Sequence, residues 1–192
     1  MNVECRRNDE ARIIVGRFCE TPWRLTQTPY NLSFRLDSPF VIRISYCLHM
    51  PYHYLEDIGT ADIAFEATGR DLAELFSDAA DATMNVMIDN LDAIEPRETR
   101  HIELSSDDIE MLLFDFLQEL IYFKDAARLL LRVRDVRIEE RDEKYSLKAE
   151  TAGEPLDAAR HHQRADVKAV TLHDFSVEKE NAGWKARVLL DI

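Results

Sequence analysis

The chain has 192 residues, of which 46% are apolar and 32% charged, and its 24 Lys and Arg against 37 Asp and Glu give a net charge of −13. This composition excludes an intrinsically disordered chain, and no run of 18 apolar residues exists that would predict a membrane span. A charge of −13 argues against strong direct binding of nucleic acid, because phosphate contacts require clustered Lys and Arg. Three cysteines form no closed disulfide set and the first residues are too polar for a secretory signal, so we expect a cytoplasmic protein.

The charge is divided unevenly along the chain, with the division near residue 50. Residues 1–49 hold all three cysteines and seven arginines against five acidic residues, a net charge of +2, whereas residues 50–192 carry −15. We therefore predict an N-terminal extension over 1–49 and a folded domain over 50–192. The extension is interpreted either as a docking arm or as a loosely folded segment outside the working protein, and we favour the second.

The first part of the domain is predicted to contain two strands and a helix. The strands are expected over Tyr52–Ile58 and Asp62–Thr68, and the second alternates apolar and polar residues in the manner of a half-buried strand. The helix is expected over Asp71–Ile88, where apolar residues recur at helical spacing. Asp71 and Glu74 have the spacing of a capping box at its start.

The middle of the domain is predicted to contain a loop, a short strand and a second helix. The loop is expected over Asn90–Arg100 and the strand over His101–Leu104, followed by a helix that Ser105 or Ser106 caps. The buried stripe of this helix is expected to consist of Ile109, Leu112, Leu113, Phe116, Leu117 and Leu120.

The last third of the chain is rich in strand patterns. A long strand is expected over Leu129–Arg141, and the phase of its apolar residues changes near Asp135, which indicates a bulge or a change of neighbouring surface. The next strand is expected over Tyr145–Thr151, and Gly153-Glu154-Pro155 is expected to end it. Three further strands are expected over Val167–Leu172, Phe175–Lys179 and Trp184–Leu190. Together the patterns predict an α+β fold with two amphipathic helices packed on largely antiparallel β-sheet.

Recognisable catalytic motifs are absent from the sequence. It contains no glycine-rich phosphate loop, no Gly-x-Ser-x-Gly and no His-Glu-x-x-His. Residues 50–192 hold no cysteine, which excludes thiol catalysis and zinc–thiolate sites there. His161, His162 and His173 are candidate metal ligands, but we favour solvated or hydrogen-bonded histidines, because adjacent histidines on one loop usually point apart.

Two acidic positions are less easily explained by local structure. Asp62 begins a strand directly after a tight turn, and Asp191 follows an apolar strand immediately before the terminal residue Ile192. Two side-chain carboxylates and an α-carboxylate would offer three hard oxygen ligands, which suit Ca²⁺ or Mg²⁺. The sequence leaves open whether these two ends meet in the fold.

The residues from about Tyr52 to Ile192 resemble the archease family. The resemblance rests on the order and spacing of several segments, of which the terminal Asp-Ile and the Val-Lys-Ala-Val-Thr segment are together the most specific. The matching segments include Gly59-Thr60-Ala61-Asp62-Ile63, Gly153-Glu154-Pro155-Leu156-Asp157, Val167-Lys168-Ala169-Val170-Thr171-Leu172-His173 and Gly183-Trp184-Lys185-Ala186-Arg187-Val188-Leu189-Leu190-Asp191-Ile192.

The resemblance implies an accessory protein and not an enzyme. Archeases assist the RtcB-type tRNA-splicing ligase by promoting its guanylylation and allowing multiple turnover. Their divalent-cation site, occupied by Ca²⁺, corresponds here to Asp62, Asp191 and the α-carboxylate of Ile192. Lys168 and His173 fall within the matching segment and are expected to flank the site. Gly59 stands where the family usually has histidine, so we expect either weaker binding at this site or the use of His53 or His173 instead.

Two other functions compete with this expectation. One is a metal-dependent phosphodiesterase that uses Asp62 and Asp191 around two metal ions. The other is a chaperone-like binding module that acts through an exposed apolar patch without metal.

Overall fold

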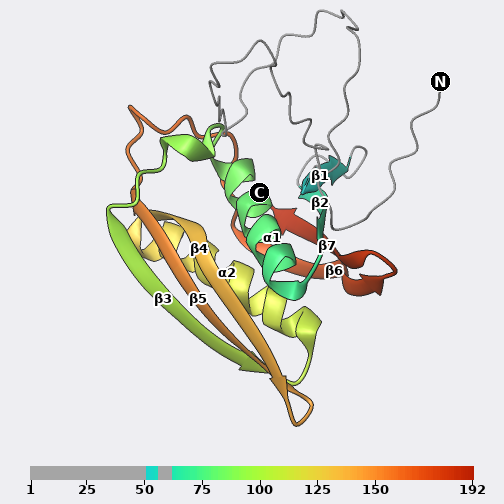
Figure 1. Ribbon diagram of the computed structural model, residues 1–192. Helices are drawn as coiled ribbons and strands as arrows, with labels where there is room; N and C mark the ends of the chain where they lie inside the picture. Colours follow the sequence, from blue (N-terminus) through green and yellow to red (C-terminus); the bar gives the residue numbers. More distant parts are fainter. Residues whose placement is uncertain (1–50, 56–61) are drawn as a thin grey trace, which may run out of the picture. The chain divides into compact units, whose positions relative to one another are not determined.

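The computed structural model describes residues 51–55 and 62–192 (Figure 1). The predicted N-terminal extension, residues 1–49, and Gly59 lie outside the described residues. Of the strand predicted over Tyr52–Ile58, the structure describes residues 52–55, all of which are in β-conformation. The elements described below all belong to the unit Met50–Ile192.

The described strands pair in two separate sheets, and every pairing among them is antiparallel. The four-stranded sheet has the order β1 (Tyr52–Leu55), β2 (Asp62–Gly69), β7 (Gly183–Asp191) and β6 (Ala169–Glu180). The three-stranded sheet has the order β3 (Glu98–Ser106), β5 (Lys144–Pro155) and β4 (Leu129–Arg141).

Two helices join the sheets into one hydrophobic core. Both α1 (Leu72–Met87) and α2 (Ile109–Ala127) contact strands of both sheets (Figure 1). Phe76 of α1 and Phe116 of α2 stack at 5.9 Å between ring centroids, and both are fully buried. The predicted α+β fold is therefore confirmed, with the antiparallel strands divided between two sheets. A short 3₁₀ helix, Leu91–Ala93, interrupts the connection after α1.

The N-terminus of α1 is capped as its sequence predicts. The Asp71 carboxylate accepts a hydrogen bond of 2.8 Å from the Glu74 N–H, and the Glu74 carboxylate accepts one of 2.7 Å from the Arg70 N–H. Replacing Asp71 with Ala leaves the Glu74 N–H without this partner. We expect Asp71→Ala to cost about 1 kcal/mol and to lower the melting temperature by about 2–4 °C. Thermal unfolding followed by circular dichroism checks this. Asp71→Asn is the matched control, because it retains the capping oxygen; equal losses for both variants would contradict the cap assignment.

The predicted serine cap of the second helix is wrong. Ser105 and Ser106 belong to β3, where they pair with Ser146 and Tyr145 of β5. The residue that caps α2 is Asp108, whose carboxylate accepts a hydrogen bond of 2.8 Å from the Glu110 N–H. Strand pairing with a distant segment thus extends β3 beyond the end expected from local propensity.

Two further strand boundaries differ from the prediction because of pairing around Gly153. The strand expected over His101–Leu104 begins at Glu98, within the loop predicted over Asn90–Arg100, and Glu98 pairs with Gly153. Gly153-Glu154-Pro155 therefore continues β5 and does not end it. A side chain at Gly153 would overlap the Leu130 carbonyl, so this glycine permits close approach of the β4 backbone.

The strands expected over Val167–Leu172 and Phe175–Lys179 form one strand, β6. Its register against β7 shifts between Thr171 and Ser176, and Asp174 lies there with a φ of 52°. The bulge replaces the predicted break, because β7 remains paired on both sides of it. The bulge predicted near Asp135 of β4 is confirmed by a register shift between Val133 and Asp135.

Candidate functional site

The two acidic residues singled out from the sequence face one another across the four-stranded sheet. Asp62 is the first residue of β2 and Asp191 the last of β7, and they are direct partners in the antiparallel register. Directly opposite residues of an antiparallel pair point to the same face, with Cβ atoms about 4.5–5.5 Å apart. The fold therefore brings together two carboxylates that are 129 positions apart in the sequence.

Strand β6 lies beside Asp191 on the other side, and Lys168 is the residue directly before this strand. Ala169 is the register partner of Asp191, and the Lys168 N–H donates a hydrogen bond of 2.9 Å to the Asp191 carbonyl. The Lys168 ammonium group donates a hydrogen bond of 2.9 Å to the main-chain oxygen of Ile192. The Ile192 side chain packs partly buried against the core, so both ends of this residue are held.

The chemistry of this group of residues fits a hard divalent cation. The carboxylates of Asp62 and Asp191 make no hydrogen bond or ion pair to another residue that the structure describes, and like charges directly opposite in a sheet repel one another. A cation with oxygen ligands would remove that repulsion. Within residues 51–55 and 62–192, no three His, Cys, Asp or Glu side chains gather in a metal-binding group. A third protein ligand would therefore be a main-chain or terminal oxygen, and Ile192 directly follows Asp191 in the chain.

His173 lies near the carboxylate pair but not in contact with it. The residue projects from the β6 bulge with an 80% exposed side chain, and its Nε2 lies 3.9 Å from the Asp174 carboxylate. It lines a cavity of about 100 Å³ together with Ala64 and Leu189, which are themselves register partners. These two residues follow Asp62 and precede Asp191 by two positions, a displacement of about 7 Å along the strands.

His53, the other candidate to replace the histidine absent at position 59, is engaged elsewhere. It is the register partner of Glu66, and its Nε2 lies 3.4 Å from the Glu66 carboxylate. Lys185 binds the same carboxylate at 2.8 Å. Since Glu66 is four residues from Asp62 on β2, His53 lies about 14 Å along the sheet from the acidic pair.

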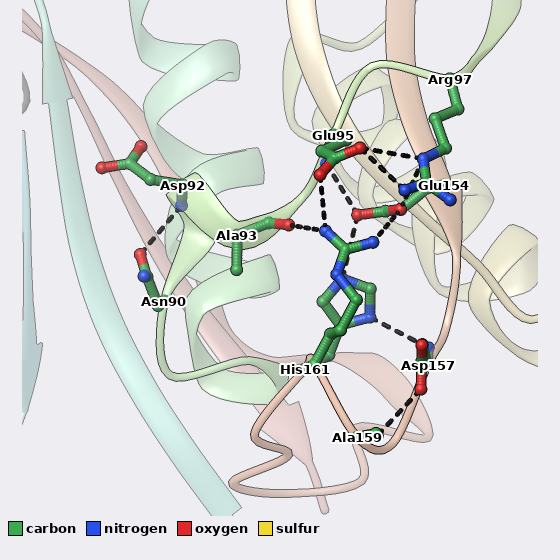
Figure 2. A network of polar contacts seen from close by, with 10 residues as sticks. Asn90, Asp92, Ala93, Glu95, Arg97, Glu154, Asp157, Ala159 and His161 are labelled. Carbon is green, nitrogen blue, oxygen red and sulfur yellow. Dashed lines mark hydrogen bonds and ion pairs between the residues drawn. The ribbon is translucent and has the colours of Figure 1, made fainter.

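A second polar group is buried around Glu154 and was not anticipated from the sequence (Figure 2). The Glu154 side chain is 1% exposed, yet its carboxylate accepts hydrogen bonds from the Glu95 N–H at 2.8 Å and from the Arg160 guanidinium at 2.7 Å. The Arg97 Nε lies 3.2 Å away. Burial alone would raise the pKa of Glu154, but these hydrogen bonds and that of His161 outweigh it and hold the pKa at about 2.

His161, one of the candidate metal ligands, is instead the fourth partner of Glu154. Its ring is buried, Nδ1 accepts a hydrogen bond of 3.0 Å from the Asp157 N–H, and Nε2 lies 3.1 Å from the Glu154 carboxylate (Figure 2). The imidazole is therefore neutral, with its proton on Nε2. The favoured interpretation of a hydrogen-bonded histidine is confirmed for His161. Every partner of Glu154 named here is a protein group, and these partners come from the loop before β3 and the loop after β5. The cluster therefore ties two loops together, which is a structural role.

Neither of the two described α-helices is long and apolar enough to cross a membrane.

Comparison with known proteins identifies the family of this α+β domain. Residues 52–192 match the family described as "Archease protein family (MTH1598/TM1083)". The chain is 39% identical over 134 residues to the protein archease of Pyrococcus abyssi, covering 69% of this chain and 94% of that protein. It is 40% identical over 144 residues to the protein archease of Methanosarcina acetivorans, covering 73% and 95% respectively. The chain belongs to the archease family.

Solved structures agree with this assignment. The solution structure of protein 1598 of Methanobacterium thermoautotrophicum is 36% identical, with a TM-score of 0.64 over 74% of this chain and 99% of that one. A crystal structure from Thermotoga maritima, titled as an archease and "possible chaperone", is 21% identical with a TM-score of 0.50 over 73% of this chain and 98% of that one, and shows the shared fold.

Proposed function

We propose that this protein is an accessory activator of an RtcB-type tRNA-splicing ligase and acts through a divalent-cation site formed by Asp62, Asp191 and the α-carboxylate of Ile192. The observation that carries the proposal is the direct pairing of Asp62 with Asp191 beside Ile192, in a chain of the archease family. Ca²⁺ is the cation that this oxygen-only set suits best, because it accepts carboxylate and main-chain oxygens in flexible geometry.

The proposed mechanism assigns a role to each residue of the site. Asp62 and Asp191 supply carboxylate oxygens from neighbouring strands, and Lys168 orients the last residue by its 2.9 Å hydrogen bond to the Ile192 main chain. A cation held by these residues would neutralise their negative charge. When the domain docks beside the ligase active site, its cation site favours the ligase state that is competent for guanylate transfer. Such an effect requires that the accessory protein bind this state more tightly than the others.

Turnover of the ligase provides the direct test. With the ligase at a concentration far below that of the RNA, wild-type protein is expected to raise the number of ligations per ligase, whereas Asp62→Ala is expected to give no stimulation at any concentration. Ca²⁺ should raise the melting temperature of the wild type but not of the variant, since a ligand stabilises only the state that binds it. Asp62→Ala should itself fold, because it removes a like-charge contact.

Asp107→Ala is the matched control for this test. Asp107 is an exposed acid before the N-terminal end of α2. Lys168, which belongs to the proposed site, lies beside the C-terminal end of the same helix, so Asp107 and the site are at opposite ends of α2. The control should stimulate turnover like the wild type. Equal stimulation by Asp62→Ala would contradict the proposed function.

Two other outcomes would indicate the competing functions. Phosphodiesterase activity of the purified protein that is lost in Asp62→Ala would indicate a metal-dependent hydrolase. Protection of clients unrelated to RNA processing, persisting in a chelator, would indicate a chaperone-like module, the possible function given for the Thermotoga maritima protein.

A further inference from the structure

Two large apolar side chains are exposed among the residues that the structure describes. Tyr122 on α2 is 61% exposed and Leu172 on the β6 bulge is 58% exposed. Single exposed apolar residues are common on protein surfaces and need no explanation by themselves. These two, however, belong to one continuous edge of the molecule.

That edge is built by a stripe of α2 residues that runs alongside strand β6. Glu110, Phe114, Gln118 and Tyr122 follow at intervals of four residues, and therefore lie on one face of the helix. The Glu110 carboxylate accepts a hydrogen bond of 3.1 Å from the Val177 N–H, and the Gln118 amide oxygen accepts one of 2.9 Å from the Val170 N–H. Phe114 contacts Phe175 with 5.9 Å between ring centroids.

These contacts place Tyr122 and Leu172 on the two sides of the Gln118–Val170 hydrogen bond. Val170 contacts Gln118 and Phe175 contacts Phe114. Because Leu172 lies between Val170 and Phe175 on β6, it lies beside the stretch of α2 between Gln118 and Phe114. Tyr122 lies one helical turn beyond Gln118, at a groove of about 450 Å³ that Lys168 also lines. We name this surface, consisting of Gln118, Tyr122, Lys168 and Leu172, the β6–α2 edge.

The β6–α2 edge is continuous with the proposed cation site. Lys168, which lines the groove beside Tyr122, also donates the hydrogen bond to the main-chain oxygen of Ile192. Thr171, the residue before Leu172, is the register partner of Leu189, two positions before Asp191. A partner that reaches the carboxylates would therefore contact this edge as well.

The charges around the edge indicate the chemistry of the partner. Asp115 and Asp125 are exposed on α2 and Asp174 on the bulge, and Asp166 is exposed just before β6. Lys168 belongs to the edge and Lys124 pairs with Asp125 and Asp166, so these acids outnumber the bases and the local charge is negative. Such a surface repels the phosphates of RNA and complements a basic protein surface. Exposed aromatic and aliphatic side chains within complementary charge are typical anchors of protein–protein contacts.

We infer that the β6–α2 edge is the surface by which this protein docks on the ligase of the proposed function, with Tyr122 and Leu172 as apolar anchors that enter a basic-rimmed surface beside the ligase active site. The inference rests on the proposed function and adds the surface of contact to it. Docking and activation are then separate: the edge sets the affinity for the ligase, and the carboxylate site sets the turnover once the complex has formed.

The test is a titration of purified ligase with Tyr122→Ser, Leu172→Ser and the double variant. Each single substitution is expected to raise the half-saturating concentration for turnover about 5- to 30-fold, with the same maximal turnover and unchanged Ca²⁺ affinity. Direct binding measured by calorimetry should weaken in parallel. Tyr122→Phe and Leu172→Met, which retain the apolar contact, are the matched controls and should titrate like the wild type.

The possible results separate this inference from the proposed function. Wild-type stimulation together with unchanged half-saturating concentrations in both serine variants would overturn the docking surface and leave the function intact. Self-association of the wild type that the serine variants abolish would assign the edge to a second copy of this chain and overturn the inference. A wild type that neither binds nor stimulates the ligase would overturn both.

Discussion

Blocking the α-carboxylate of Ile192 is expected to weaken Ca²⁺ binding and ligase activation together. Adding a few residues after Ile192 converts the α-carboxylate into a neutral amide and would remove one of the three charged oxygen ligands that we propose. The number of charged ligands governs the affinity of calcium sites. We expect the dissociation constant for Ca²⁺ to rise at least about tenfold, which corresponds to a loss of about 1.4 kcal/mol. Isothermal titration calorimetry with Ca²⁺ checks this directly.

Two controls distinguish loss of charge from steric obstruction. A chain that ends at Ile192 with a C-terminal carboxamide loses the charge without added bulk and is expected to bind as weakly as the extended chain. Ile192→Val retains the α-carboxylate and should bind Ca²⁺ like the wild type. Unchanged Ca²⁺ affinity in the extended and amidated chains would contradict the assignment of Ile192 as a ligand, whatever the result with Asp62→Ala.

The largest effect on stability is expected from Glu154→Gln. The substitution removes the charge that the Arg160 guanidinium and the His161 ring surround, and the new amide group has to face a donor. Hydrogen bonds to a charged group are worth about 1.5–3 kcal/mol each. Because the Arg160 side chain is 34% exposed and keeps Glu95 as a partner, we expect a loss of about 2–3 kcal/mol. Urea unfolding at pH 7 measures this loss. Glu150→Gln on the same strand is the matched control, since Glu150 is exposed, and it is expected to change stability by less than about 0.5 kcal/mol.

The pH dependence of stability, compared between the wild type and Glu154→Gln, gives a second test of the Glu154 cluster. The pKa of Glu154 is lowered from its ordinary value of 4.5 to about 2 in the folded state. A carboxyl group with a lowered pKa stabilises the fold above its unfolded pKa and loses that contribution as the pH falls through its folded pKa. The stability difference between wild type and Glu154→Gln should therefore be constant above about pH 5 and shrink between pH 4.5 and 2. A difference that does not change with pH would show that the cluster does not depend on the Glu154 charge.

Local patterns predicted the elements of this fold better than their boundaries. The α1 helix and its Asp71 cap depend on residues within one turn of each other, and both are found as predicted. The predicted limits of β3 and β5 were wrong, because pairing of Glu98 with Gly153 depends on residues far apart in the sequence. Gly153 was interpreted as a strand end, whereas it serves the close approach of β4.

The candidate site was only partly predictable for the same reason. Asp62, Asp191 and Ile192 stood out because acidic residues directly before or after well-patterned strands are poorly explained by local structure, and the resemblance to archeases named the same positions. Glu154 carried no such signal, since an acid between glycine and proline is ordinary in a turn. Tyr122 fell at the end of an expected helix, and nothing in its local pattern marks an exposed edge.

The amino-acid sequence by itself determined the class of fold, the buried stripe of α2 apart from the partly buried Ile109, the acidic character of the domain and the family to which it belongs. These follow from composition, short-range periodicity and motif spacing. The tertiary structure alone decided that Asp62 lies opposite Asp191, that Lys168 holds the Ile192 main chain, that Glu154 is buried among its partners, and that Tyr122 and Leu172 share one edge. Each of these depends on the register of strands joined across long stretches of chain, where a shift of one residue turns every side chain to the opposite face.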